Sequence, residues 1–168
     1  GDVITPDGKN AQNIATRTNK KRACAVSINT IAASEVLYRM ETMVLLELHE
    51  KINIVTLLTN CESWTLLKRE ITSLETAEIQ CIKNMFDLPL KTPTPGIIFT
   101  LGTLFTKFRI AQRQLIYLQR IVQRQAQHWT HRTLTILIDL NIGWYRHINK
   151  TLKEFHLTQN IEEIKKMT

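Results

Sequence analysis

The chain has 168 residues, of which 43% are hydrophobic and 7% aromatic, and its formal net charge is +7. This composition excludes a disordered chain, which would carry fewer apolar residues and more charge. The length suits one ordinary domain or two very small ones. No apolar run is long enough to span a bilayer and no secretory signal is evident. The three cysteines, Cys24, Cys61 and Cys81, form no Cys-x-x-Cys pair, which argues against a disulfide framework. We therefore expect an intracellular protein, cytoplasmic or nuclear, with no membrane partner.

The spacing of apolar residues predicts a mainly α-helical chain, a helical bundle with a short β-strand and turn remnant at its N-terminus. Val3-Ile4 followed by Thr5-Pro6-Asp7-Gly8 indicates the end of a strand that enters a tight turn. Helical periodicity then predicts helices near residues 10–33, 36–58 and 67–86. The polar run at residues 59–63 separates the last two.

The second half of the chain begins with a cluster of helix breakers at Pro89, Pro93, Pro95 and Gly96. A short helix is expected near residues 97–101, a long one at 105–127 and an amphipathic one at 144–155, whereas residues 133–140 are only marginally helical. The expected organisation is a palm-like strand end and turn at 1–10, a thumb-like helical bundle at 11–88, a Pro-containing linker and short helix at 89–104, and a basic helix with a C-terminal helical segment at 105–168.

Charge is distributed unevenly along the chain. Residues 1–34 carry about +3 and residues 35–87 about −4, whereas residues 88–138 contain no acidic residue. A basic block beside an acidic block indicates a surface that faces a polyanion, and a merely solvated basic face is the alternative. The basic residues of the acid-free stretch are Lys91, Lys107, Arg109, Arg113, Arg120, Arg124 and Arg132.

The predicted helix at 105–127 gathers its arginines on one side. At about 100° per residue, Arg109, Arg113, Arg120 and Arg124 fall within an arc of roughly 60°, with Tyr117 beside them. The guanidinium fork can donate two parallel hydrogen bonds to a phosphate. An ordinary solvated helix that uses Arg as its polar residue is the alternative. The predicted opposite, apolar side consists of Phe108, Ala111, Leu115, Leu118 and Val122. The other candidate nucleic-acid-binding residues are Lys9, Arg17, Lys20, Lys21 and Arg22.

Signals for catalysis are weak. The aspartates are scattered, so no carboxylate group converges as two-metal nucleotidyl transfer requires. His49-Glu50 begins a zinc-protease-like pattern, but Asn53 replaces its second histidine. His128 and His131 have no nearby cysteine that would complete a metal site. We therefore expect no catalytic residue, metal site or cofactor in this chain.

Two segments, in this order, resemble the region that follows the catalytic palm in the reverse transcriptases of LINE-type (non-LTR) retrotransposons. The first is Gly-Asp-Val-Ile-Thr-Pro-Asp-Gly-Lys-Asn at residues 1–10, and the second is Leu-Leu-Thr-Asn-Cys-Glu-Ser-Trp-Thr-Leu at residues 57–66. Leu74-Glu75 in the next helix and the Arg-rich stretch after Leu101-Gly102 extend the likeness to about residue 125. Each motif is short, and their shared order is what makes the resemblance specific.

The resemblance implies a thumb-like, non-catalytic fragment of an RNA-directed DNA polymerase. It implies an RNA/DNA or DNA duplex as a partner, together with the upstream palm domain of the same polyprotein, where Mg²⁺ would be bound. Trp64 and Glu62 would be structural, Trp64 as a core anchor and Glu62 in a cap or pair. Leu67 stands where the family often has a capping Thr. Because the chain begins at Gly1 rather than Met, we expect a fragment.

Two other interpretations remain open. The first is a helical protein–protein interaction module, in which Met40, Met43 and the Leu-rich helix around them face a partner. The second is a non-functional retroelement relic that still folds.

Overall fold

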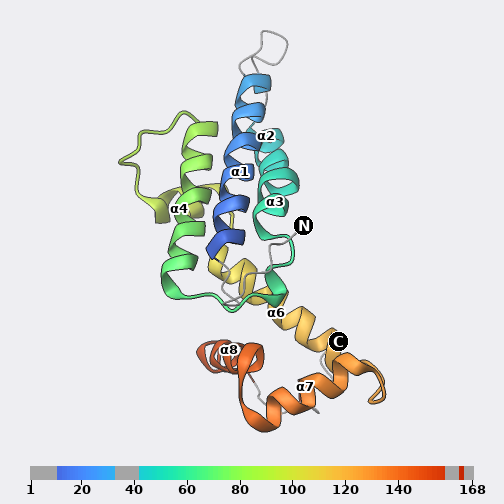
Figure 1. The fold of residues 1–168 in the computed structure, drawn as a ribbon. Helices are drawn as coiled ribbons and strands as arrows, with labels where there is room; N and C mark the ends of the chain where they lie inside the picture. The colour runs from blue at the N-terminus through green and yellow to red at the C-terminus, as the bar shows by residue number, and fades with distance from the viewer. Residues whose placement is uncertain (1–10, 33–41, 158–162, 165–168) are drawn as a thin grey trace. The chain divides into compact units, whose positions relative to one another are not determined.

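The structure, a computed structural model, describes residues 11–32, 42–157 and 163–164, and this part of the chain is helical without a strand (Figure 1). The expected mainly α-helical fold is confirmed there, whereas the expected strand and turn at residues 1–10 lie outside the described residues. The chain divides into two compact units. The first comprises the residues up to Thr59 together with Leu66–Lys107, and the second comprises Asn60–Thr65 together with the residues from Phe108 onward.

The first unit is built from helices close to those predicted. Helix α1 (Ala11–Ala32) packs against α4 (Lys68–Met85), α3 (Val55–Leu58) and the π-helical turn (His49–Ile54) (Figure 1). The described part of the predicted helix at 36–58 is continuous but contains the π-helical turn, in which each backbone N–H bonds one residue further back than in an α-helix. The elements are α1 (Ala11–Ala32), α2 (Thr42–Leu48), the π-helical turn (His49–Ile54), α3 (Val55–Leu58), α4 (Lys68–Met85) and α5 (Thr94–Leu101).

The core of the first unit lies along α4. One cluster joins Ala25 and Leu45 to Cys81 and Met85. A second cluster joins Ile79 and Ile82 of α4 to Ile97 and Ile98 of α5. Helix α5 is therefore packed against α4, although its sequence stretch, 89–104, was expected to be a linker with a short helix.

The ends of α5 show how its sequence sets its bounds. Pro93 is the N-cap and a second proline occupies the first turn, where a missing backbone N–H costs nothing. Gly102 follows the helix with a φ of 62°, in the left-handed region that favours glycine, and its N–H bonds to the last turn.

The first turn of α4 is capped although its N-cap residue, Leu67, has an apolar side chain. Leu67 is the N-cap and has no side-chain acceptor, but the Glu70 carboxylate reaches back and accepts the Leu67 N–H at 2.7 Å. This is one of the two bonds of a capping box. The helix start therefore has the Glu70 bond of a capping box but not the bond from an N-cap side chain.

The second unit has its own core. The apolar residues of this core come from three helices and include Leu118, Val122, Leu134, Ile148 and Leu152. The stretch at 133–140, expected to be marginally helical, is the C-terminal part of a regular helix. The elements are a 3₁₀ turn (Cys61–Ser63), α6 (Thr106–Val122, whose first two residues belong to the first unit), α7 (Trp129–Leu140) and α8 (Gly143–Glu154).

Residues 60–65 are tied to the second unit by side-chain donors. Asn60 has a φ of 58°, a left-handed conformation that asparagine tolerates, and it precedes the 3₁₀ turn. Gln114 of α6 is buried, and its Nε2 donates to the Trp64 carbonyl at 2.8 Å and to the Cys61 carbonyl at 3.4 Å. Trp144 of α8 donates from Nε1 to the Glu62 carbonyl at 2.8 Å.

Within the described ranges, no helix combines the length and the apolarity that crossing a membrane requires.

Replacing Gln114 with Leu tests how residues 60–65 are held. The substitution keeps an apolar side chain in the buried position but removes the donor to the Trp64 carbonyl. Losing a donor to a buried acceptor costs about 1–3 kcal/mol, so the free energy of unfolding measured with urea should fall by that amount. Gln112→Leu is the matched control, because Gln112 is exposed on the same helix, and it should change stability by less than about 0.5 kcal/mol. Equal effects from both variants would contradict this account.

Candidate nucleic-acid interface

The predicted basic residues of α1 separate into exposed and buried positions. Lys20 and Arg22 are exposed, and Arg17 is half-buried with its Nη1 3.4 Å from the Thr56 carbonyl of α3. Lys21, however, is 0% exposed. It lies seven residues after Ile14, on the helix side that packs inward. Lys21 therefore lies inside the unit, and only its neighbours offer charge to a ligand. Lys9 lies outside the described residues.

The predicted arginine row on α6 is not uniform either. Arg120 is exposed, whereas Arg109, Arg113 and Tyr117 are half-buried. The ring of Tyr117 meets that of Trp144 edge-on, with centroids 5.6 Å apart. Helix α6 ends at Val122 rather than Gln127, so the exposed Arg124 belongs to the turn that follows, where its Nη1 lies 3.2 Å from His128 Nε2.

The buried face of α6 explains this difference. Ile110, Gln114, Leu118 and Ile121 recur at steps of four and three residues and are all buried. Because the buried stripe includes Gln114, it is turned toward the arginine side relative to the predicted face around Leu115. Arg113 consequently sits at the edge of the core instead of opposite it.

Trp64 and Glu62 make structural contacts in the second unit. Trp64 is 2% exposed, and its carbonyl accepts the Gln114 amide. Glu62 is held through its backbone carbonyl by the Trp144 indole, and the carboxylate takes no part in that bond.

The first unit contains a buried polar cluster that sequence reasoning did not predict. His49 and Asn53 of the π-helical turn are fully buried, and the Asn53 amide donates to Cys81 Sγ at 3.3 Å. Glu78 Oε1 lies 3.8 Å from His49 Nε2. The abandoned zinc-protease-like pattern marked these positions, but they serve as polar core residues. The available signal was the helical spacing, which places His49 and Asn53 one turn apart among buried apolar residues.

The thiol of Cys81 is unsuited to nucleophilic chemistry. Burial raises its pKa, the charge of Lys21 lowers it, and the charge of Glu78 raises it. The thiolate is the reactive form, so a raised pKa keeps this cysteine inert near neutral pH. Since both Lys21 and Glu78 act on Cys81, opposite charges occupy one region of the core.

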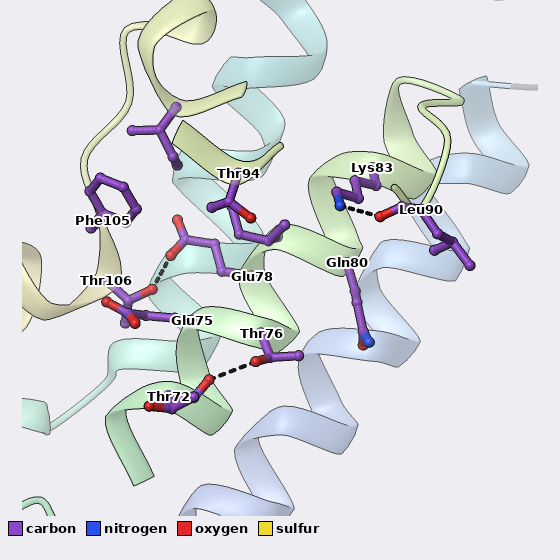
Figure 2. A pocket seen from close by; sticks show the side chains of 12 residues that line it. Thr72, Glu75, Thr76, Glu78, Gln80, Lys83, Leu90, Thr94, Phe105 and Thr106 are labelled. Carbon is purple, nitrogen blue, oxygen red and sulfur yellow. Dashed lines mark hydrogen bonds between the residues drawn. The ribbon is translucent and has the colours of Figure 1, made fainter. Parts of the chain in front are cut away.

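A cavity of about 480 Å³ opens beside this cluster, over α4 and α5. Figure 2 shows Glu78 and Thr106 pointing toward one another, and the Thr106 hydroxyl donates to the Glu78 carboxylate. The one lysine that lines the cavity, Lys83, donates from Nζ to the Leu90 carbonyl at 2.5 Å (Figure 2). Glu75 and Glu78 line it against the single Lys83, so the formal charge of its lining is negative, which is unfavourable for a phosphate.

No group of three or more histidine, cysteine or acidic side chains in the described ranges could hold a metal ion. Comparisons of the chain with protein-family models, with curated proteins and with solved structures returned no match.

The buried thiol of Cys61, whose pKa Arg113 also influences, gives a test of how the second unit packs. Burial raises the pKa of Cys61 from 9.0 to about 11, the Arg113 guanidinium lowers it and Glu62 raises it. The folded state therefore holds this proton more tightly than the unfolded state does. The stability that this proton contributes is complete below about pH 9 and is lost as the pH rises toward 11.

In the Cys61→Ala variant this part of the pH dependence should disappear. Two pKa units correspond to at most about 3 kcal/mol, so the stability lost by the native chain between pH 8 and 10.5 should exceed the loss in the variant. Urea unfolding at both pH values measures the difference, and the data at pH 8 correct for the cavity left by the substitution. Parallel curves for the two proteins would show that the thiol is not buried in this way.

Proposed function

We propose that this chain is a non-catalytic, thumb-like part of a LINE-type retrotransposon reverse transcriptase that holds template–primer nucleic acid through basic side chains. The observation that carries the proposal is the acid-free stretch 88–138, in which Arg120 and Arg124 are exposed. Lys91, Lys107 and Arg132 of the same stretch are exposed as well. The order of the family-like motifs at residues 1–10 and 57–66 supports the origin.

The mechanism is electrostatic. Each guanidinium or ammonium group near a backbone phosphate displaces condensed counterions, so binding strengthens as salt is lowered. Such contacts position a duplex and carry little sequence information. The chemical step belongs to an upstream palm domain, which would bind Mg²⁺ and supply the carboxylates. An RNA/DNA hybrid and a DNA duplex both present the required phosphates.

Charge reversal at Arg120 and Arg124 tests the proposal. The Arg120→Glu/Arg124→Glu variant should bind an RNA/DNA duplex at least tenfold more weakly at about 100 mM salt. The slope of log K against log salt should become shallower by about 2, because two phosphate contacts are lost. Fluorescence anisotropy across a salt series measures both quantities.

The matched control is Lys150→Glu/Lys153→Glu. It makes the same change in net charge at two exposed positions of α8 and should retain most of the affinity. If the native chain fails to bind any duplex at low salt, the proposed function is wrong. If both double variants lose affinity equally, only net charge matters and the arginines form no defined interface.

A second candidate function is a helical protein–protein interaction module. It is favoured by the apolar side chains that α2, the π-helical turn and α3 leave exposed, namely those of Met43, Val44, Ile52 and Val55. Met40 lies outside the described residues. Under this alternative, the native chain should not bind the RNA/DNA duplex at low salt, and Met43→Gln/Val55→Gln should abolish binding to a protein partner such as a LINE-type palm fragment. Isothermal titration of the native chain with the duplex, and of both proteins with the palm fragment, separates the two candidate functions.

A further inference from the structure

A groove of about 450 Å³ lies in the first unit, between one face of α1 and the first turns of α4. These two helices run side by side (Figure 1). The groove lies apart from the acidic cavity above α5, and the two share no lining residue. Its polar lining is Thr18, Asn19 and Arg22 from α1 with Arg69, Glu70 and Ser73 from α4.

Each helix brings an arginine and a hydroxyl to the groove, one turn apart. On α1 these are Arg22 and Thr18, and on α4 they are Arg69 and Ser73. Residues four apart lie on the same side of a helix, so both pairs face the same space. Guanidinium and hydroxyl groups are common partners of phosphate oxygens in nucleic-acid complexes.

The hydroxyl of Thr18 departs from the behaviour of other helical threonines. Thr72 and Thr76 of α4 donate to the backbone carbonyl four residues back, at 3.1 and 2.8 Å. Thr18 is only 7% exposed, and its Oγ1 is buried without a hydrogen-bond partner among the described residues. A buried hydroxyl that lacks a partner is unfavourable. A ligand oxygen in the groove would provide the missing bond.

The charges around the groove select the kind of anion. Glu70 also lines it, but one of its oxygens, Oε2, accepts the Leu67 N–H and completes the α4 cap. Two arginines and one carboxylate leave a formal charge of +1. A phosphodiester carries one negative charge, so it balances the groove without leaving an excess of either sign.

We propose that this groove binds one backbone phosphate of a nucleic-acid strand, with Arg22 and Arg69 as the charged partners and the Thr18 hydroxyl as a donor. The inference rests on the proposed function and assigns it a specific contact. It also separates Arg22 from Lys20 in the basic cluster of α1, because Lys20 does not line the groove.

Two variants of the full chain test this contact with a fluorescent RNA/DNA duplex. Arg22→Gln/Arg69→Gln should weaken binding roughly tenfold, the factor expected for losing charge-assisted hydrogen bonds, and should make the salt slope shallower by about 1. Thr18→Val should weaken binding about fivefold with an unchanged salt slope, because no charge is removed. Its thermal stability should be equal to or above that of the native chain, since the buried hydroxyl without a partner is gone.

The control is Lys51→Gln/Lys68→Gln, which removes two exposed cations of the same unit that do not line the groove. It should change affinity less than threefold. If the native chain binds the duplex and the groove variants bind as tightly as this control, the phosphate site is wrong and the proposed function stands. If the native chain does not bind the duplex at low salt, both fail. A Glu-rich peptide that binds as tightly as the duplex, and loses affinity in the same variants, would overturn the phosphate assignment in favour of an acidic protein partner.

Discussion

The first unit depends on keeping opposite charges together inside a small helical core. Lys21 and Glu78 are 0% and 1% exposed, and the charges of both act on the pKa of the Cys81 thiol. An ion taken out of water costs several kcal/mol unless a partner compensates it. The register of α1 against α4 places both residues where their charges act on Cys81. Apolar residues alone would tolerate a shift of either helix more easily.

The packing of α1 against α4 also forms the groove between these two helices. With α1 fixed against α4, Thr18 and Arg22 necessarily lie opposite Arg69 and Ser73. The π-helical turn places both His49 and Asn53 in the same core, where the Asn53 amide donates to Cys81. The groove and the buried cluster therefore share one stretch of α1, where Lys21 lies between Thr18 and Arg22, and use different turns of α4.

The positions of the helices could be predicted from the sequence, because apolar periodicity and the Pro and Gly breakers mark them. The burial of Lys21 was also predictable: it lies seven residues after Ile14 and four before Ala25, on the side of α1 that both occupy. We did not predict its burial because a charged lysine is expected at the surface. The tilt of the α6 core face could not be predicted, because a buried Gln114 depends on acceptors at Cys61 and Trp64, some fifty residues earlier. The groove could not be predicted either, because the sequence alone does not say which helix packs against α1.

Several acidic residues of the first unit are paired with a nearby hydrogen-bond donor or cation. Glu70 caps α4, Glu78 accepts the Thr106 hydroxyl, and the exposed Glu47 pairs with Lys51 at 2.5 Å. Each of these carboxylates keeps a nearby donor or cation, so much of its field is compensated locally. Arg120 and Arg124 lie in a stretch where no carboxylate is close in sequence. Their charges therefore have no compensating carboxylate nearby in sequence, in contrast to the paired acidic residues of the first unit. Under the proposed function, these arginines contribute the part of the affinity that declines as salt is raised.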